Sequence, residues 1–329
     1  MTALAPTLQA FFTDRLMTQR QASPHTVAAY RDTLRLLLRY AQHRTGKNPA
    51  ELTFTDLDAP IIGAFLSYLE TGRNNSVTTR NTRLTAIHSL FGYAALHVPE
   101  HAALIARVLA IPAKRHNHPT VSFLNRDEIN ALLAAPDTST WTGRRDHGLL
   151  LVAVQTGLRV SELTGLNNSD IELGTGPNLR CHGKGRKDRA TPLTRQTVDV
   201  LREWLAERGG DPTGPVFPSG RGTRLSRDAV EHLVAKHAQT AARACPSLTG
   251  KKVTPHVLRH SAAMALLHSG VDITIIALWL GHESPATTRV YLHADMALKE
   301  QALARMTPPD QQPGRYAPPD TLLAFLETL

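Results

Sequence analysis

The segment from Thr254 to His293 constrains this chain most strongly, because helix-cap residues divide it into short helices. Thr254 followed by a proline is typical of a helix start, while Gly270 and Gly281 each follow an apolar run and are typical of helix ends. Ser284, also followed by a proline, indicates the start of a third helix. These helices carry four chemically active side chains: His256, Arg259, His282 and Tyr291.

Such a set of side chains suits attack on a phosphodiester. A tyrosine oxygen can act as the nucleophile, an arginine can hold the non-bridging oxygens, and histidines can move protons. The transition state carries extra negative charge on two oxygens, so a second guanidinium and an acid for the leaving alcohol are expected. Both occur upstream: Arg159 lies at a turn into a helix, and Lys184 lies at a glycine-flanked hairpin tip.

Four separated motifs, TGLRVSEL, HGKGRKDRATPL, HVLRHS and LGHESPATTRVYLH, follow one another between residues 156 and 293. In this order they resemble the tyrosine recombinases of the phage-integrase family, close to its Xer-like bacterial branch. The resemblance implies a mainly α protein with a small antiparallel sheet, built from an N-terminal helical SAM-like core-binding domain and a C-terminal mixed α/β catalytic domain. It also implies six catalytic residues, with Lys184 as the acid and Lys187 in reserve: Arg159, Lys184, His256, Arg259, His282 and Tyr291.

The resemblance further implies a site-specific DNA recombinase that works through a 3′-phosphotyrosyl intermediate. Double-stranded DNA is then the partner, and four protomers on two DNA sites, or a related partner recombinase, complete the reaction. No cofactor, nucleotide or metal is expected, because one phosphoester is exchanged for another of similar free energy and two guanidiniums supply positive charge. Glu162 is expected to orient Arg159, a lysine or a histidine; an ordinary carboxylate in a first helical turn is the alternative.

Composition agrees with a globular DNA-binding protein. The 329 residues are 42% hydrophobic, enough for two domains with ordinary cores, and the formal net charge of +9 favours a polyanionic partner. Two cysteines are too few for a disulfide framework, which indicates a reducing compartment. No apolar run is long enough to cross a membrane and no leader pattern opens the chain, so a cytoplasmic protein without a membrane partner is expected.

The region 1–111 is predicted to be a helical bundle, with helices at about 7–17, from 24 onward, at 60–70, from 77 onward and at 99–109. The resemblance implies that this domain grips DNA. Its arginines are either phosphate contacts or the solvated faces of amphipathic helices. The candidate DNA-binding residues of this domain, the linker and the hairpin are Arg31, Arg35, Arg73, Arg80, Arg83, Lys114, Arg115, Arg186 and Lys187.

Residues 112–121 contain two prolines and a basic centre, which predicts a linker that lies along DNA or forms a solvated strap. The catalytic domain is predicted at 122–306, with helices near 126–134 and 144–155 and a three-stranded sheet at 169–173, 178–182 and 189–193. Residues 307–329 form a proline-rich tether and an amphipathic helix. The resemblance implies that this tail passes to a neighbouring protomer.

Other interpretations were weighed against this one. His256 and His260 have the i, i+4 spacing of a zinc site, but neither a neighbouring glutamate nor a third ligand is evident, so His260 is expected to pack beside the site. The glycine spacing does not fit a phosphate-binding loop. A type IB topoisomerase uses a similar residue set, and a catalytically silent DNA-binding derivative is a different class, although such a derivative would be expected to lose some of the six residues. Integration or excision, transposition and replicon resolution remain open roles, because target choice depends on base contacts.

Overall fold

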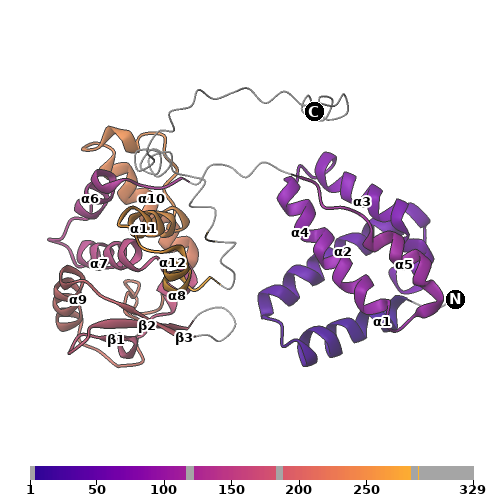
Figure 1. Cartoon of the computed structure of the whole chain (residues 1–329), viewed down its shortest axis with the longest axis horizontal. Helices are drawn as coiled ribbons and strands as arrows, with labels where there is room; N and C mark the ends of the chain where they lie inside the picture. The colour runs from indigo at the N-terminus through magenta and orange to yellow at the C-terminus, as the bar shows by residue number, and fades with distance from the viewer. Residues whose placement is uncertain (1–3, 116–121, 183–187, 283–287, 289–329) are drawn as a thin grey trace, which may run out of the picture. The chain divides into compact units, whose positions relative to one another are not determined.

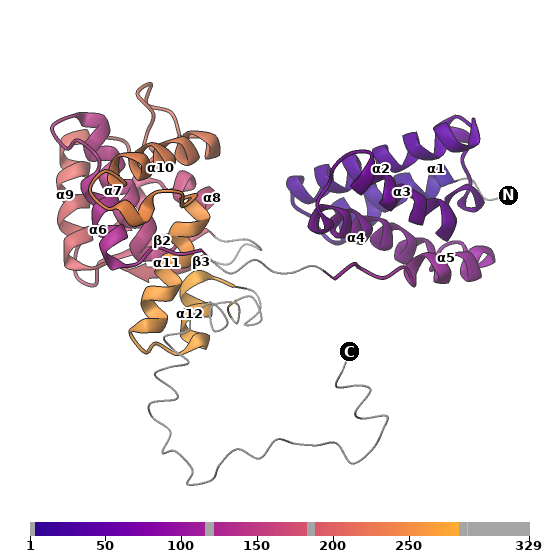
Figure 2. The same cartoon turned by 90° about the horizontal axis from the view of Figure 1, so that it is seen from above.

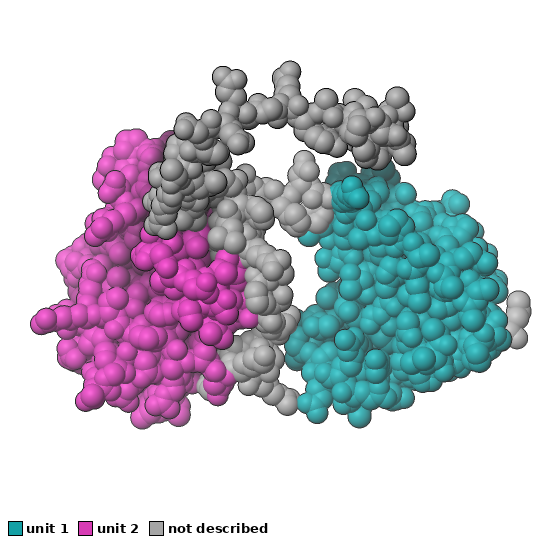
Figure 3. All heavy atoms as spheres, in the orientation of Figure 1, with its two compact units in different colours: residues 1–118 teal, residues 119–329 magenta. Residues whose placement is uncertain are grey.

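The computed structural model describes residues 4–115, 122–182, 188–282 and Thr288. The chain divides into two compact units, Met1–His118 and Pro119–Leu329, which Figure 3 shows in separate colours. Each unit has its own hydrophobic core. The observed elements confirm the predicted fold class, which is mainly helical with a small antiparallel sheet in the second unit.

The first unit is a bundle of helices around an aromatic core. Side-chain oxygens of Ser23, Asp58 and Ser76 accept main-chain N–H bonds at the starts of three helices. Four phenylalanines, at positions 11, 54, 65 and 91, are fully buried in the core. The helices are α1 (Leu4–Ala10), a π-helical continuation (Phe11–Gln19), α2 (Pro24–Thr45), α3 (Ala59–Thr71), α4 (Val77–Ala94) and α5 (Ala102–Leu109), with short 3-10 turns at Pro49–Glu51, Phe54–Leu57 and Pro99–His101.

In the second unit the central helix is α7 (Trp141–Thr156), which packs against α6, α9 and α11. It begins three residues earlier than predicted, because the Thr140 hydroxyl accepts from the Gly143 N–H and caps it. Figures 1 and 2 both show α11 beside α12. The remaining helices are α6 (Arg126–Ala134), α8 (Val160–Gly165), α9 (Arg195–Arg208), α10 (Arg227–Ala241), α11 (Pro255–His268) and α12 (Ile273–Leu280).

The sheet of this unit has three antiparallel strands in the order β1 (Ile171–Glu172), β2 (Asn178–His182) and β3 (Asp188–Pro192). β1 is shorter than predicted, with two residues in place of five. In the β2–β3 register Leu179 pairs with Thr191 and Cys181 pairs with Arg189. Paired residues of an antiparallel sheet share a face, so the side chains of Cys181 and Arg189 lie on the same side of the hairpin.

Candidate active site

Two arginines of the predicted site are held by the carboxyl-terminal ends of helices. α7 and α12 each end at a glycine in the left-handed conformation, Gly157 and Gly281, and the last carbonyls of a helix have no partner within it. Arg259, on α11, donates from Nη1 to the Gly157 oxygen at 2.6 Å and from Nη2 to the Leu280 oxygen at 2.8 Å. Arg259 is only 3% exposed. The negative ends of two helix dipoles therefore stabilise this buried cation.

Arg159 contacts the same turn of α12 from another direction. It precedes α8 as the N-cap residue, and its Nη2 donates to the Gly281 oxygen at 3.0 Å. Its Nη1 donates to Glu162 Oε1 at 2.8 Å, while its main-chain N–H donates to Glu162 Oε2 at 2.8 Å. Glu162 thus binds both the main chain and the guanidinium of Arg159, and the two guanidiniums meet at residues 280 and 281.

Both cap glycines are required by close packing as well as by their positive φ angles of 63° and 64°. A Cβ atom on Gly157 would lie 2.6 Å from Leu280 Cδ2 and 3.2 Å from the Ala262 Cβ. A Cβ atom on Gly281 would lie 2.6 Å from Arg189 Nη1. Any larger residue would therefore displace the Leu280 or Arg189 side chain and would also be strained by the positive φ angle.

The histidines of the site are kept uncharged at neutral pH. Burial, together with Arg259 and Arg159, lowers the pKa of His282 to about 4, and the same causes lower the pKa of His256. The His282 Nδ1 lies 2.8 Å from the Thr288 hydroxyl oxygen. The ring of His260 lies 4.1 Å, centroid to centroid, from that of His256, and burial lowers the pKa of His260 to about 4. The His260 ring therefore packs against that of His256.

A cavity of about 510 Å³ opens over these groups. Arg159, His256 and Arg259 line it, with Arg227 and Lys252 contributing further positive charge. Its lining has three guanidiniums, one ammonium and one imidazole against the single carboxylate of Glu231, so it suits a phosphate-bearing ligand better than an apolar one.

Arg189 is a part of this site that the sequence motifs did not single out. From β3 it donates to both carboxylate oxygens of Glu162, at 3.1 and 2.9 Å. Burial alone would raise the pKa of Glu162, but the hydrogen bonds from Arg189 and Arg159 lower that pKa below its usual value. The signal available in the sequence was only a fourth basic residue in the run GKGRKDR.

Four of the predicted residues lie outside the described part of the chain: Lys184, Arg186, Lys187 and Tyr291. The site built from the described residues therefore comprises Arg159, His256, Arg259 and His282, with Glu162 and Arg189 holding Arg159. Within residues 4–115, 122–182 and 188–282, no group of three His, Cys, Asp or Glu side chains could hold a metal ion. The described helices also include none with the length and apolar character needed to span a membrane.

Three of the predicted DNA-binding arginines of the first unit lie near one carboxylate. Arg31 and Arg35, on α2, lie 3.1 and 3.7 Å from Asp32. Burial and the positive charge of Arg73 lower the pKa of Arg83, while Asp32 raises it, so Arg83 lies near both Asp32 and Arg73. The face formed by α2, α4 and the α3–α4 turn thus concentrates positive charge.

Arg80 and Lys114 have structural contacts within the first unit. Arg80 is only 6% exposed, and its Nη1 donates to the Pro112 oxygen at 3.1 Å. The Asn81 amide donates to the Lys114 oxygen at 2.8 Å and accepts from the Lys114 N–H at 3.1 Å. The Lys114 ammonium pairs with Glu70, and Arg115 is exposed. Residues 112–114 are therefore fastened to the first unit by α4.

Comparison with known proteins agrees with this architecture. The phage integrase family matches residues 122–297, and the N-terminal SAM-like domain of phage integrases matches residues 10–97. The Sinorhizobium fredii protein y4rC, named as an integrase/recombinase, is 57% identical over 327 residues, covering 99% of this chain and 98% of that protein. The tyrosine recombinase XerC of Pelobacter propionicus is 34% identical over 282 residues, covering 85% of this chain and 88% of that protein.

Among solved structures, the site-specific recombinase XerH bound to a palindromic difH substrate, in a post-cleavage complex, has the same fold. The TM-score is 0.68 at 24% sequence identity, covering 88% of this chain and 82% of that one. The family matches and the relatives together settle the class of protein. This chain belongs to the phage integrase family and is a tyrosine recombinase, an enzyme that cleaves and rejoins DNA strands.

Proposed function

We propose that this chain is a site-specific recombinase that exchanges DNA strands through a 3′-phosphotyrosyl intermediate. The observation that supports this most directly is the convergence of Arg159 and Arg259 on the last turn of α12, where both arginines line one cavity together with His256. Two guanidiniums in a partly buried cleft match a transition state with two charged non-bridging oxygens. The site supplies this charge from its own side chains.

In the proposed reaction Arg159, Arg259 and His282 hold the scissile phosphate. The phenolic oxygen of Tyr291 attacks phosphorus, a new O–P bond forms, and the bond from phosphorus to the 5′-oxygen breaks. His256, whose pKa is lowered, is neutral at pH 7 and can take the tyrosine proton. Lys184 gives a proton to the departing 5′-oxygen. A 5′-hydroxyl from a second duplex then reverses these steps.

The first unit is proposed to bind the duplex through the basic face around Asp32. Arg31, Arg35, Arg73 and Arg83 are its phosphate contacts, joined by Lys114 and Arg115 and, from the hairpin, by Arg186 and Lys187. Arg80 is better assigned to holding the linker, because it is buried against Pro112. We divide the chain for function into a DNA-binding domain at 1–111, a linker at 112–121, a catalytic domain at 122–306 and a tail at 307–329.

Recombination requires four protomers on two DNA sites, either of this chain alone or with a related recombinase. The relatives named integrase/recombinase and XerC support roles in integration or excision and in replicon resolution, and transposition uses the same chemistry. We propose that the tail passes to a neighbouring protomer. Its deletion should then impair assembly on paired sites more than cleavage by one protomer, and unchanged assembly would contradict this exchange.

The test is a suicide-substrate assay on nicked duplexes from the native locus, read as a covalent protein–DNA band on denaturing gels. Wild-type protein should form an adduct on the 3′ side, and Tyr291→Phe should bind DNA without forming it. Arg159→Ala should slow adduct formation about a hundredfold, by analogy with the loss of one oxyanion-hole donor. If the wild-type protein binds its DNA without an adduct, the chain is a binding-only derivative or awaits a partner recombinase.

A further inference from the structure

The Arg189 guanidinium binds the carboxylate that holds Arg159, although Arg189 is not one of the six residues of the proposed mechanism. Its two terminal nitrogens donate to the two oxygens of Glu162, and the side chains of this pair are 12% and 3% exposed. The same two oxygens accept from the Arg159 main-chain N–H and from Arg159 Nη1. Glu162 thus divides one negative charge between a catalytic arginine and Arg189.

Arg189 also packs directly against the turn that holds both catalytic arginines. The Cβ position of Gly281 is only 2.6 Å from Arg189 Nη1 and 3.2 Å from Arg189 Cζ, so the guanidinium fills the space where a side chain would lie. The Gly281 oxygen is the acceptor for Arg159 Nη2. Arg189 therefore contacts both supports of Arg159, which are the Glu162 carboxylate and the end of α12.

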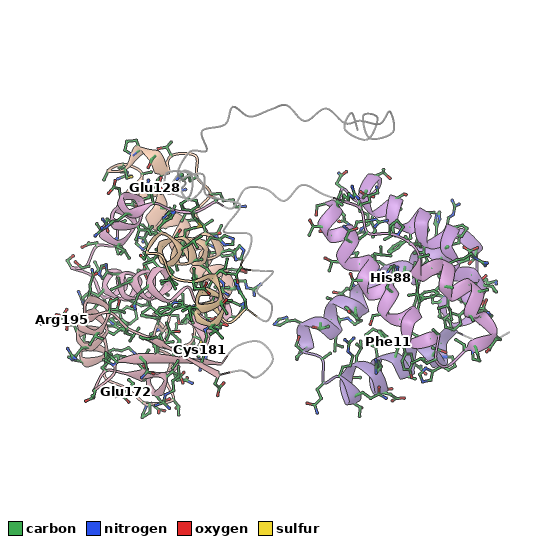
Figure 4. All side chains as sticks on the ribbon, viewed as in Figure 1. Phe11, His88, Glu128, Glu172, Cys181 and Arg195 are labelled. Atoms are coloured by element: carbon green, nitrogen blue, oxygen red, sulfur yellow. The ribbon has the colours of Figure 1, made fainter. Side chains whose placement is uncertain are left out.

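The position of Arg189 in the sheet adds a third connection. It pairs with Cys181 across β2 and β3, and Figure 4 shows Cys181 on the sheet side of this unit. Burial raises the pKa of the Cys181 thiol to about 11, so the thiol that pairs with Arg189 across the strands is uncharged at neutral pH. Arg189 forms its ion pair with Glu162. The β2–β3 pair is thereby tied to α8 and α12.

We propose that Arg189 is a positioning residue of the recombinase site, which holds Glu162 and the α12 turn so that Arg159 meets the scissile phosphate. This inference rests on the proposed function for its catalytic readout. Removing one partner of a buried ion pair leaves an uncompensated charge, which is more damaging than removing both. Without Arg189, Glu162 would draw the Arg159 guanidinium away from the cleft or become protonated.

The experiment compares full-length wild type, Arg189→Met, Glu162→Gln and the double variant on the same nicked duplex. At saturating DNA, Arg189→Met should cleave roughly 10- to 100-fold more slowly, as expected when a reacting group is displaced by about an ångström. Its Kd for uncleaved DNA should stay within about twofold of wild type, because a positioning residue does not bind phosphate itself. In the Glu162→Gln background the Arg189→Met change should cost much less than it does alone.

A control with the same chemistry is Arg202→Met, which removes an exposed arginine that pairs with Asp199 on α9, at 58% and 55% exposure. This variant should cleave like wild type. The double variant keeps the test valid if Arg189→Met alone does not fold, because it carries no unpaired buried charge. A parallel loss of DNA affinity, or equal effects of Arg189→Met in both backgrounds, would overturn the proposal.

A second readout does not depend on cleavage. The positive charge of Arg189 is one of the causes that lower the pKa of His282. In DNA-free protein, NMR titration of His282 should show a higher pKa in Arg189→Met than in wild type, whereas Arg202→Met should leave it unchanged. An unchanged His282 pKa in Arg189→Met would refute this placement of Arg189, whereas absence of an adduct from wild type would count against the proposed function alone.

Discussion

The imidazoles of this site are the residues at which local environment most alters chemistry. His256, His260 and His282 would each titrate near neutrality in water, but burial among guanidiniums keeps them uncharged. An uncharged histidine can accept a proton from a phenol, which a charged one cannot. In the proposed reaction, the arginines that hold the phosphate would therefore also keep His256 ready to accept a proton.

This environment has a cost in stability that depends on pH. The pKa of His260 is about 4 in the folded protein and 6.5 as a free side chain, so between these values the unfolded chain binds more protons. Above pH 7 the group is neutral in both states and contributes nothing to the pH dependence. As the pH falls from 6.5 towards 4, the free energy of unfolding should therefore fall, and it should fall less steeply in His260→Leu.

Urea denaturation followed by tryptophan fluorescence measures this effect in the full chain. All three tryptophans, Trp141, Trp204 and Trp279, lie in the second unit, so the signal reports on that unit. Plots of the free energy of unfolding against pH should diverge below pH 6.5, with wild type falling more steeply than His260→Leu. A stability difference that stays constant from pH 7.5 to pH 4.5 would contradict the assignment of His260 as a buried neutral group.

At the residue scale the sequence predicted Arg159, His256, Arg259 and His282 because fixed motifs carry them. It did not predict Arg189, because a single arginine within a basic hairpin cannot be distinguished from its solvated neighbours. Only the packing of β3 against α8 and α12 shows that Arg189 pairs with Glu162. A pairing between residues 27 positions apart leaves no local pattern in the chain.

Among the structural elements, α4 has a role that its sequence pattern conceals. Arg80 and Asn81 face residues 112–114 and bind their main chain, so the first part of the predicted linker is fastened to the first unit. The Asn81 side chain bonds both the N–H and the C=O of Lys114, as a neighbouring strand would in a sheet. The tether between the units is therefore shorter than the proline and charge pattern suggests.

Replacing Asn81 with alanine should release this segment. The change removes both hydrogen bonds to the Lys114 main chain, each worth about 1 kcal/mol, and one from Arg80 Nη1. Local release of the main chain at Lys114 and Arg115 should therefore become roughly 30-fold more frequent. Limited trypsin digestion should accordingly cut after these residues faster in Asn81→Ala than in wild type. Thr82→Ala, which removes an exposed hydroxyl on the same helix, is the matched control and should digest like wild type.

If the cutting rate of Asn81→Ala equals that of Thr82→Ala, the hydrogen bonds of Asn81 do not restrain the linker.

Prediction of the elements themselves was most successful where cap residues flank an apolar repeat, as in α2, α3, α6 and α11. The motif-based prediction does not include α9 and α10. Thr194 and Ser226 cap them in the structure, but neither helix carries a catalytic motif that would draw attention to it.

For the molecule as a whole, the net charge of +9 is distributed unevenly. On the first unit, Arg31, Arg35 and Arg83 lie near Asp32, which offsets part of their field, and Arg73 lies near Arg83. Phosphate contacts release counterions, and each one steepens the dependence of log K on log salt by about 0.9. Asp32 should therefore weaken DNA binding by occupying the arginines that would otherwise meet phosphates.

Asp32→Asn should accordingly bind double-stranded DNA more tightly than wild type at 0.1 M salt, with a steeper salt dependence. Fluorescence anisotropy with labelled duplex across a salt series measures both quantities. Asp199→Asn makes the same chemical change beside Arg202 on the second unit, and it should have a smaller effect. Equal effects of the two variants would mean that only net charge matters and that the Asp32 face is not the DNA-binding surface.

The division into two helical units and the location of the small sheet could be predicted from charge, proline content and hydrophobic periodicity. The convergence of Arg159 and Arg259 on one helix end could not, because it depends on how α7, α8, α11 and α12 pack in three dimensions. Sequence motifs predict which side chains react. Tertiary packing decides which acceptors hold those side chains in place.

Three of the acceptors that hold Arg159 and Arg259 are main-chain oxygens, those of Gly157, Leu280 and Gly281. No codon change can delete a main-chain oxygen, so alanine scanning would not detect these contacts. Substitution of many surrounding side chains can therefore leave these acceptors of Arg159 and Arg259 in place. The feature that must be kept is the path of the backbone at these two helix ends. That path depends on the glycines at positions 157 and 281.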